Sequence, residues 1–511
     1  MNIVILHCHL QSGGVTQVIE NHVHAITNEA SAHRILLVSS SRVSGLRIPN
    51  IEHLALDALD YDSPSLAKGT ADSRADSIVV ELQNRLAEPG IAADDTVLHW
   101  HNHSLGKNTA LPAAIARLAA SGWRQFLQIH DFAEDNRPEN YRRLIDAIAA
   151  QTPADLDRYL YPVSPTIHYG TLTGGDAEVL RRIGVPADQV HCVPNSVRLP
   201  NDVPDHEESL DHVRRTFGLP VDARWCLYPV RGIRRKNVGE FLLFSQLAGE
   251  SVFAGITLCP ETPVERRSYL RWKSIASEVS PRVVFDAADG VPFLTNLAAA
   301  DFIVSTSVAE GFGMAMLEPW LAGRPVIARD LPSVTGDFLD SGIQLPNQYE
   351  RLPIPGTQTW LAAAVQETKQ AFEQAWSTLP KTFRPDAPSF DVSESTIDFA
   401  SLVPQRQVAV LRCLSDDHAF RNEVREACAS VIDGVTSLPD KTIIQQNQNV
   451  IARLYGAEHQ ASQLLAIYSS LLDDVGTELT TTVANAGDCQ NEVSQSRPFY
   501  PCRTEWLQTV G

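Results

Sequence analysis

The sequence lacks the features of several large protein classes. None of its 511 residues lie in a stretch approaching the roughly 18 uninterrupted apolar residues of a membrane-spanning helix. Eight cysteines are scattered without a Cys-x-x-Cys pair, which favours reduced thiols over a disulfide framework or a zinc knuckle. The N-terminal "MNIVILHCHL" has no basic leader and alternates like a strand, so we expect a cytoplasmic protein.

Signatures of common nucleotide-binding proteins are also missing. No Gly-x-Gly-x-x-Gly follows the first predicted strand, and no Gly-x-x-x-x-Gly-Lys-Ser/Thr occurs, so dehydrogenase and P-loop functions lose their main support. The formal net charge of -19 argues against nucleic acid as the main partner, because phosphate binding depends on Lys and Arg. Any anion must therefore be bound by a local basic patch.

The chain does contain a regular alternation of short apolar runs, such as "NIVIL", "RILLVSS" and "DFIVSTS", with helical stretches. This alternation predicts an α/β protein with two Rossmann-like, doubly wound parallel sheets and a C-terminal helical module. The run "RLPNDVPDHEE" breaks the pattern with two prolines and several acids, and we interpret it as a hinge. The expected segments are an N-terminal domain at 1–200, a second domain at 206–348, a helical insertion or appended module at 350–440, C-terminal helices at 441–475 and a weakly ordered tail at 476–511.

In open parallel sheets, ligands bind beyond the carboxyl ends of the strands. Gly13 and Gly14 follow the first predicted strand at the start of a helix, where free N–H groups favour an anion, although such a pair is more often a plain turn. Histidines crowd other strand ends in "HCH", "HWHNH" and "QIHD". If the strand persists, His99, His101 and His103 share one face, as a zinc site would need. No carboxylate or cysteine completes the set at normal spacing, so we favour packing or hydrogen bonding to a polyhydroxylated ligand.

The second half of the chain holds a basic cluster and a pair of glutamates at predicted strand ends. "PVRGIRRKN" places four basic residues after a strand, where a phosphate clamp is favoured over a solvated loop. In "AEGFGMAMLEP", Glu310 lies in the loop after the strand "DFIVSTS", and Glu318 falls in the first turn of a helix that we expect to begin near Met316. Two glycines beside Glu310 open backbone N–H groups toward a ligand rich in hydroxyl groups.

This segment resembles the family 4 retaining glycosyltransferases of the GT-B fold. The resemblance rests on "S-x-x-EGFG-x-x-x-LE-x-x-x-AG-x-PVIA", matched over residues 307–328, and on the five-residue separation of Arg231 and Lys236. "GGV" after the first strand, "VPNSV" at 193–197 and "YG...IY" in the C-terminal helices add to it. Three positions depart from the family pattern, because Val230 and Asn237 stand where glycine is usual and Thr306 where proline is usual.

The resemblance implies two domains facing a cleft, with the donor side on the second domain and the acceptor side on the first. Arg231 and Lys236 would bind the diphosphate of a UDP-, GDP- or ADP-linked sugar, and Glu318 would hold the ribose hydroxyls. The implied ligands of the donor sugar and phosphates are His130, Glu310, Gly311, Phe312, Gly313, Gly13 and Gly14. The polar segments around the strand ends of the first domain assign the acceptor side to His9, His101, Asn102, His103 and Asp131. Such enzymes generally react without a protein nucleophile, a bound metal or another cofactor.

The predicted function is transfer of a hexosyl group, with retention, to the hydroxyl of a small metabolite or a glycan. The sequence does not identify the acceptor, and it is compatible with a peripheral contact with a membrane. A sugar-nucleotide epimerase or phosphorylase of the same fold and a non-catalytic sugar-nucleotide-binding protein are the alternatives. A metal-dependent transferase using Asp60 and Asp62 is disfavoured, because three-residue motifs arise by chance and such enzymes do not have two Rossmann-like halves.

Overall fold

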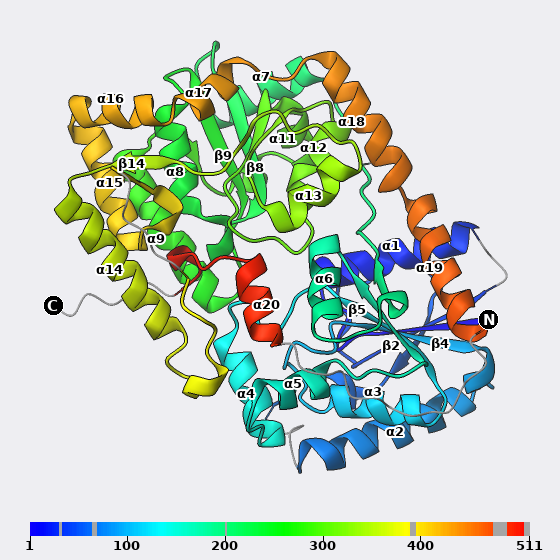
Figure 1. Cartoon of the computed structure of the whole chain (residues 1–511). Coiled ribbons are helices and arrows are strands. Elements are labelled where there is room, and N and C mark those ends of the chain that lie inside the picture. The colour runs from blue at the N-terminus through cyan, green and yellow to red at the C-terminus, as the bar shows by residue number, and fades with distance from the viewer. Residues whose placement is uncertain (30–32, 64–68, 200–201, 389–394, 474–487, 505–511) are drawn as a thin grey trace. The chain divides into compact units, whose positions relative to one another are not determined.

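The computed structural model describes all residues except 30–32, 64–68, 200–201, 389–394, 474–487 and 505–511 (Figure 1). The chain forms two compact units, each assembled from three stretches of sequence. Unit 1 comprises Met1–Ser196, Trp376–Asp386 and Leu454–Arg497. Unit 2 comprises Val197–Ala375, Ala387–Arg453 and Pro498–Gly511.

Unit 1 contains a parallel sheet in the order β3-β2-β1-β4-β5-β6-β7. Its strands are β1 (Asn2–Leu6), β2 (Arg34–Ser39), β3 (Glu52–Ala55), β4 (Thr96–His101), β5 (Arg124–Ile129), β6 (Ile167–Thr171) and β7 (Val190–Cys192). Helices α1 (Gly14–Glu29) and α19 (Ala457–Asp473) pack together on one face, and α2 (Ala71–Ala87), α3 (Leu111–Ala120) and α5 (Pro153–Leu160) lie on the other (Figure 1). Because both faces are covered, β1 is buried almost throughout and reads as a continuous apolar run.

Unit 2 repeats this plan with a second sheet in the order β10-β9-β8-β11-β12-β13. Its strands are β8 (Arg224–Arg231), β9 (Val252–Leu258), β10 (Val283–Val284), β11 (Phe302–Ser305), β12 (Val326–Arg329) and β13 (Gln348–Tyr349). Helix α7 (His206–Phe217) precedes β8, and the helices between the strands include α8 (Val238–Leu247), α9 (Pro263–Val279), α11 (Phe293–Ala299), α12 (Glu318–Leu321) and α13 (Pro332–Asp340). Every strand pairing in both sheets is parallel, so the predicted pair of doubly wound sheets is confirmed.

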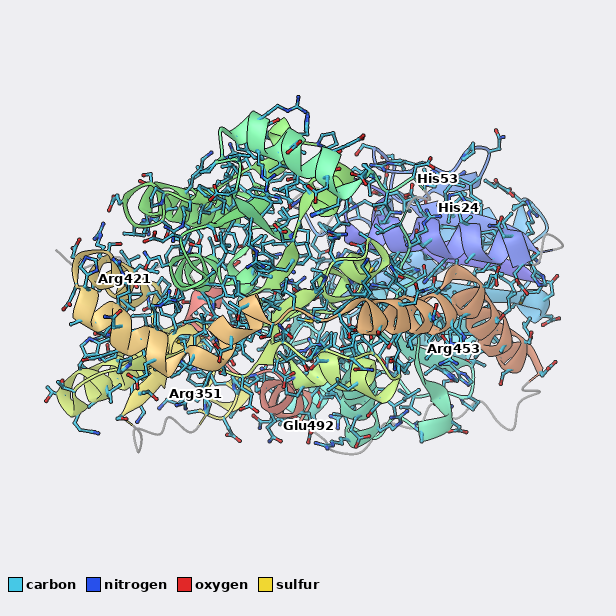
Figure 2. All side chains as sticks on the ribbon, turned by 90° about the horizontal axis from the view of Figure 1, so that it is seen from above. His24, His53, Arg351, Arg421, Arg453 and Glu492 are labelled. Carbon is cyan, nitrogen blue, oxygen red and sulfur yellow. The ribbon has the colours of Figure 1, made fainter. Side chains whose placement is uncertain are left out.

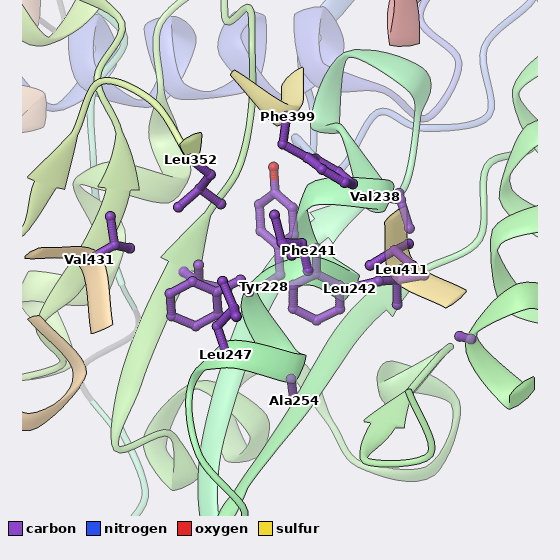
Figure 3. Close-up of a cluster of buried hydrophobic side chains, with 14 of the residues drawn as sticks. Tyr228, Val238, Phe241, Leu242, Leu247, Ala254, Leu352, Phe399, Leu411 and Val431 are labelled. Atoms are coloured by element: carbon purple, nitrogen blue, oxygen red, sulfur yellow. The ribbon is translucent and has the colours of Figure 1, made fainter. Parts of the chain in front are cut away.

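Most of the segment at 350–440 completes the core of unit 2. It forms β14 (Pro353–Pro355), α14 (Gln358–Ala375), β15 (Thr396–Asp398), α15 (Pro404–Asp416), α16 (His418–Ala427) and α17 (Ala429–Thr436), followed by α18 (Lys441–Leu454). Figure 3 shows Leu352, Phe399 and Leu411 of this segment buried beside Tyr228 of β8 and Phe241 of α8. The helical module is therefore part of the second hydrophobic core, a role that the helical pattern alone did not predict.

A buried ion cluster also joins this segment to the sheet of unit 2. Arg329, at the end of β12, contacts Glu240 at 2.7 Å and Asp398 at 2.9 Å. Tyr349 donates a hydrogen bond to Glu240 at 2.9 Å. Arg329 and Glu240 are fully buried, so each charge depends on the others for solvation.

The tail at 476–511 contains a packed segment in its described part, residues 488–504. This segment forms α20 (Cys489–Ser496) in unit 1 and a short 3₁₀ turn at Pro501–Arg503 in unit 2. Just after α20, Arg497 is buried and contacts Asp135 at 3.1 Å and Asp176 at 2.6 Å, while Glu492, labelled in Figure 2, pairs with Arg182 at 3.0 Å. The expectation of weak order is wrong for this segment. Local sequence could not predict its packing, because its ionic partners lie more than 300 residues away in sequence. The rest of the tail lies outside the described residues.

Among the helices that the structure describes, none is both long and apolar enough to span a membrane.

Candidate functional site

The loop after β8 places Lys236 at the carboxyl edge of the second sheet. β8 ends at Arg231, and a 3₁₀ turn over Arg234–Lys236 leads to Asn237 at φ 48° and ψ 58°. Asn tolerates this left-handed conformation better than most residues, which explains how Asn237 stands where the family usually has glycine.

Two hydroxyl groups fix this loop from the neighbouring strands. The hydroxyl of Thr306 donates hydrogen bonds to the carbonyl oxygens of Lys236 at 3.0 Å and Asn237 at 3.3 Å. The hydroxyl of Tyr228 also donates to the carbonyl oxygen of Lys236, at 3.1 Å. Tyr228 is in turn hydrogen-bonded to Ser307 at 2.7 Å. Proline, usual at position 306, could not make these bonds, so this departure gives the chain an additional tie on the loop.

A buried ion pair joins the two motifs of unit 2. The ammonium of Lys236 donates a hydrogen bond to Oε1 of Glu310, and Arg235 lies 4.0 Å from the second carboxylate oxygen. Burial raises the pKa of Glu310, but Lys236 and Arg235 outweigh it and hold the pKa below its ordinary value. Burial lowers the pKa of Lys236. The pair sets a cation and an anion, both nearly excluded from water, at the sheet edge.

The loop between Glu310 and Glu318 is shaped by a glycine and an aromatic contact. Gly313 has φ 91°, and a Cβ there would lie 2.9 Å from the side chain of Val334, so only glycine fits without strain. Phe312 is buried and meets Phe338 edge to face at 5.7 Å. A 3₁₀ turn over Met314–Met316 follows, and α12 begins at Glu318, two residues later than the predicted start.

Glu318 differs from Glu310 in having no compensating charge. No described residue forms an ion pair or hydrogen bond with its half-buried carboxyl group. Burial raises the pKa of Glu318 to about 7. A carboxyl group left unpaired in such a place can accept hydrogen bonds from the hydroxyl groups of a ligand.

The other basic residues of this loop have different partners. Arg231 is half-exposed and contacts Glu261 at 3.2 Å, and Arg234 is bound to Glu265 at 3.0 Å. Arg235, rather than Arg231, is the arginine beside Glu310. The family spacing selected Arg231 and Lys236, and it could not identify Arg235, whose position depends on the 3₁₀ turn.

In unit 1, the end of β5 brings His130 against His101 of β4. Nδ1 of His101 and Nε2 of His130 are 2.8 Å apart, so one nitrogen donates to the other. Asn102, at φ 55°, accepts hydrogen bonds from the backbone N–H groups of His130 at 2.8 Å and Asp131 at 3.3 Å. Burial lowers the pKa of His130 to about 4, so its ring is neutral at pH 7.

The expected alignment of His99, His101 and His103 is wrong, because β4 ends at His101. His103 is instead buried and hydrogen-bonded to the carbonyl oxygen of Leu160 at 2.9 Å. His22 of α1 takes its place, and the ligand atoms of His22, His99 and His101 lie within 4.8 Å of one another.

This histidine group is a stack of rings. The rings of His99 and His101 have centroids 4.3 Å apart and planes inclined by 26°. Both nitrogens of His99 are hydrogen-bonded, to Tyr468 at 2.7 Å and to Gln128 at 2.9 Å. Because both nitrogens of His99 already have hydrogen-bond partners, the arrangement favours packing over metal binding.

The first strand of unit 1 ends in an open glycine loop. Gly13 and Gly14 are exposed, and a Cβ at Gly14 would meet no atom within 4 Å, so their backbone is accessible. His9 lies edge-on to Tyr61 at 4.9 Å between ring centroids.

Two cationic side chains that were not predicted from the sequence lie over the ring of Tyr61. The guanidinium of Arg42 lies 5.7 Å from the ring centroid, and the ammonium of Lys107 lies 5.5 Å from it. Arg42 is paired with Asp60 at 2.7 Å, and Arg137 with Asp131 at 3.0 Å. No carboxylate within the described ranges forms an ion pair with Lys107. Burial lowers the pKa of Lys107, and the nearby Arg137 and Arg143 lower it further.

Comparison with known proteins agrees with the resemblance. No family model matches the sequence. The chain is 27% identical over 470 residues to mannosylglucosyl-3-phosphoglycerate synthase of Petrotoga mobilis, covering 88% of each protein. Its structure is similar to sucrose-phosphate synthase of Thermosynechococcus elongatus, with a TM-score of 0.50, 15% identity and coverage of 92% and 99% of the two chains. It is also similar to HepE of Anabaena, crystallised with UDP and glucose, with a TM-score of 0.51, 13% identity and coverage of 92% and 100%. These likenesses show the fold, and the chain has the predicted GT-B fold.

Proposed function

We infer that this chain, a hexosyltransferase of the GT-B fold, moves a hexosyl group with retention from a nucleotide-diphosphate sugar to the hydroxyl group of an anionic acceptor. One observation carries the donor half of this proposal. At the edge of one sheet, Lys236 forms a buried ion pair with Glu310, and the short motif that holds Glu310 also holds Glu318, a carboxyl group without a counter-charge among the described residues.

The donor roles follow from the charges that develop during glycosyl transfer. Negative charge builds on the departing diphosphate, so cations that are already in place lower the barrier directly. Lys236 and Arg235 are held by Glu310 and by the loop contacts, while Arg231 can leave its exposed partner Glu261 to reach a phosphate. These residues orient and neutralise the leaving group.

The two glutamates would hold different parts of the donor. Glu318 would accept hydrogen bonds from the ribose hydroxyls, because a carboxylate can accept one bond on each oxygen. Glu310 and the backbone N–H groups of Gly311, Phe312 and Gly313 would contact the sugar. His130 in unit 1 is assigned to the donor sugar, with its ring neutral and held by His101.

The acceptor half rests on the basic groups around Tyr61. Lys107 and Arg42 flank this ring beside His9, and Lys107 is held near Arg137 and Arg143 in spite of like-charge repulsion. Such an arrangement suits an anion, which relieves the repulsion when it binds. The Petrotoga relative is named for the synthesis of a phosphoglycerate glycoside, so we propose a glycoside of 3-phosphoglycerate as the acceptor.

A screen of UDP-, GDP- and ADP-sugars tests the donor half. Binding would be followed by thermal shift, and transfer by release of nucleoside diphosphate, with the anomeric configuration of the product read by NMR. Lys236→Ala should lower kcat by about 10²- to 10³-fold. The control is Lys273→Ala, which removes an exposed lysine of α9 that is paired with Asp286, and it should leave kcat unchanged. No binding of any sugar nucleotide, or normal turnover by Lys236→Ala, would overturn the proposal.

A pair of acceptors tests the second half. Glucosyl-3-phosphoglycerate would be compared with the same glycoside lacking the phosphate. Lys107→Ala should raise the KM for the phosphorylated acceptor and leave the donor KM unchanged. Equal use of both acceptors by the unaltered protein would contradict an anionic acceptor while leaving the donor assignment intact.

A further inference from the structure

Three ligand atoms from distant segments meet in the interior of unit 1, outside the residues assigned to donor and acceptor. They belong to Glu134 in the loop after β5, Asp157 on α5 and Cys489 at the start of α20. A carboxylate oxygen of each acid and the sulfur of Cys489 lie within 4.8 Å of one another. The residues are 1%, 7% and 0% exposed, respectively.

Each of the two acids has one satisfied and one unsatisfied oxygen. Oε2 of Glu134 accepts a hydrogen bond from the hydroxyl of Tyr161 at 3.0 Å, and Oδ2 of Asp157 accepts one from the backbone N–H of Cys489 at 3.1 Å. Oε1 of Glu134 and Oδ1 of Asp157 are buried without a hydrogen-bond partner. The hydroxyl of Tyr141 is also buried without a partner, and it interacts electrostatically with Glu134, Asp157 and Cys489. Buried oxygens without partners are costly, and native structures usually provide a donor, a water molecule or an ion for them.

No described residue supplies a compensating cation in contact with the cluster. Arg158, which acts on Asp157 through space, is itself bound to Asp155.

The same unit shows a different solution for two other buried acids. Asp135, the residue after Glu134, shares the buried guanidinium of Arg497 with Asp176. Among the described residues, one buried acid pair thus has a cation as partner, whereas the pair of Glu134 and Asp157 has none.

We propose that Glu134, Asp157 and Cys489 form a binding site for a divalent metal ion of the zinc class, with the fourth position taken by water or by the hydroxyl of Tyr141. One thiolate and two carboxylates are ligands that zinc accepts at about 2.0–2.3 Å, which places the ligand atoms roughly 3.5 Å apart. The present spread of 4.8 Å or less therefore closes with a movement of about 1 Å.

Metal binding at this site is an exchange of protons for the ion, without any redox step. The thiol proton and any protons held by the two carboxyl groups leave to solvent. Three anionic ligands around a divalent cation then carry a net charge of -1. The ion would tie the start of α20 to α5 and to the loop that begins at His130, four residues before Glu134.

The test uses the full chain and the metal alone as probe. Metal content of the purified protein is measured by plasma mass spectrometry, and the chelated protein is titrated with cobalt(II). We expect one equivalent of zinc, or one of cobalt with a thiolate-to-cobalt charge-transfer absorption band. Adding zinc should raise the Tm, and a chelator should reverse the rise.

Matched variants locate the ion. Cys489→Ser and Glu134→Gln should lose the bound equivalent, and Cys489→Ser should also lose the absorption band. Cys413→Ser, which removes the exposed thiol on α15, should keep both. If Cys489→Ser fails to fold, Glu134→Gln and the titration of the unaltered protein still decide the question. Absence of zinc and of the cobalt band in the folded, unaltered protein would overturn the proposal, as would a band that Cys413→Ser abolishes.

Discussion

Glu318 offers a quantitative test of the donor site, because its pKa near 7 makes both stability and nucleotide binding depend on pH. The perturbation is Glu318→Gln, which keeps the size of the side chain and removes its titration. Glu250→Gln, at an exposed glutamate of unit 2, is the matched control.

The stability effect follows from the raised pKa. Burial moves the pKa of Glu318 from its ordinary value of 4.5 to about 7. Because one pKa unit corresponds to about 1.36 kcal/mol, the shift represents at most about 3 kcal/mol of stability. Solvent that reaches this half-buried carboxyl group reduces that figure. Between these two pH values the folded state binds more protons than the unfolded state, so stability falls as pH rises from about 4.5 to 7. Glu318→Gln should flatten this slope in urea unfolding.

The binding effect has the opposite sign. The ionised carboxylate accepts both ribose hydroxyls, so nucleoside diphosphate binding should favour deprotonation and release about half a proton at pH 7. Affinity should rise about ten-fold between pH 6 and pH 8, in line with the ionised fraction. Calorimetry in buffers of different ionisation enthalpy measures the released proton. Equal proton release by the unaltered protein and Glu318→Gln would refute the assignment of Glu318 to the ribose.

Three further predictions concern stability and are checked by urea unfolding. Arg497→Ala should cost about 3–5 kcal/mol, because it leaves Asp135 and Asp176 buried without their cation, and an unchanged midpoint would contradict that pairing. Arg329→Ala should cost a similar amount through Glu240, whereas a loss below about 1 kcal/mol would mean that the carboxylate finds another partner. Asn237→Val should be about 1–2 kcal/mol less stable than Asn237→Gly, and equal stabilities would argue against the left-handed backbone.

The sequence predicted most strands of both sheets, including β4 and β5, whose runs carry histidine and glutamine. It missed β3, β6 and β13. β6 contains the buried His168 and Thr171, so the segment Ile167–Thr171 does not read as an apolar run. β3 is an edge strand with a half-exposed pattern, and β13 has only two residues. In each case pairing with a neighbouring strand, which local sequence does not encode, decides the structure.

The candidate site was predictable where a motif fixes both residue type and spacing. Glu310 and Lys236 were named from such motifs, and the structure places them in contact. Arg235 was named only as part of the basic cluster, and the family spacing selected Arg231 instead, because the position of Arg235 depends on a 3₁₀ turn. Lys107 was not named, because its place beside Tyr61 depends on the approach of a different segment. His103 was misplaced because the end of β4 turns at Asn102, whose positive φ no periodicity reveals.

The assembly of unit 1 from separate stretches has a consequence for how the protein is made. The strip of Leu464, Ile467, Tyr468 and Leu471 on α19 belongs to the same buried cluster as Ile3, Ile5 and Val23 near the N-terminus. During synthesis, the ribosome produces the first sheet long before it produces the helix that covers one of its faces. The nascent chain therefore exposes an apolar surface for most of its time on the ribosome. During this period, chaperone binding or aggregation competes with folding.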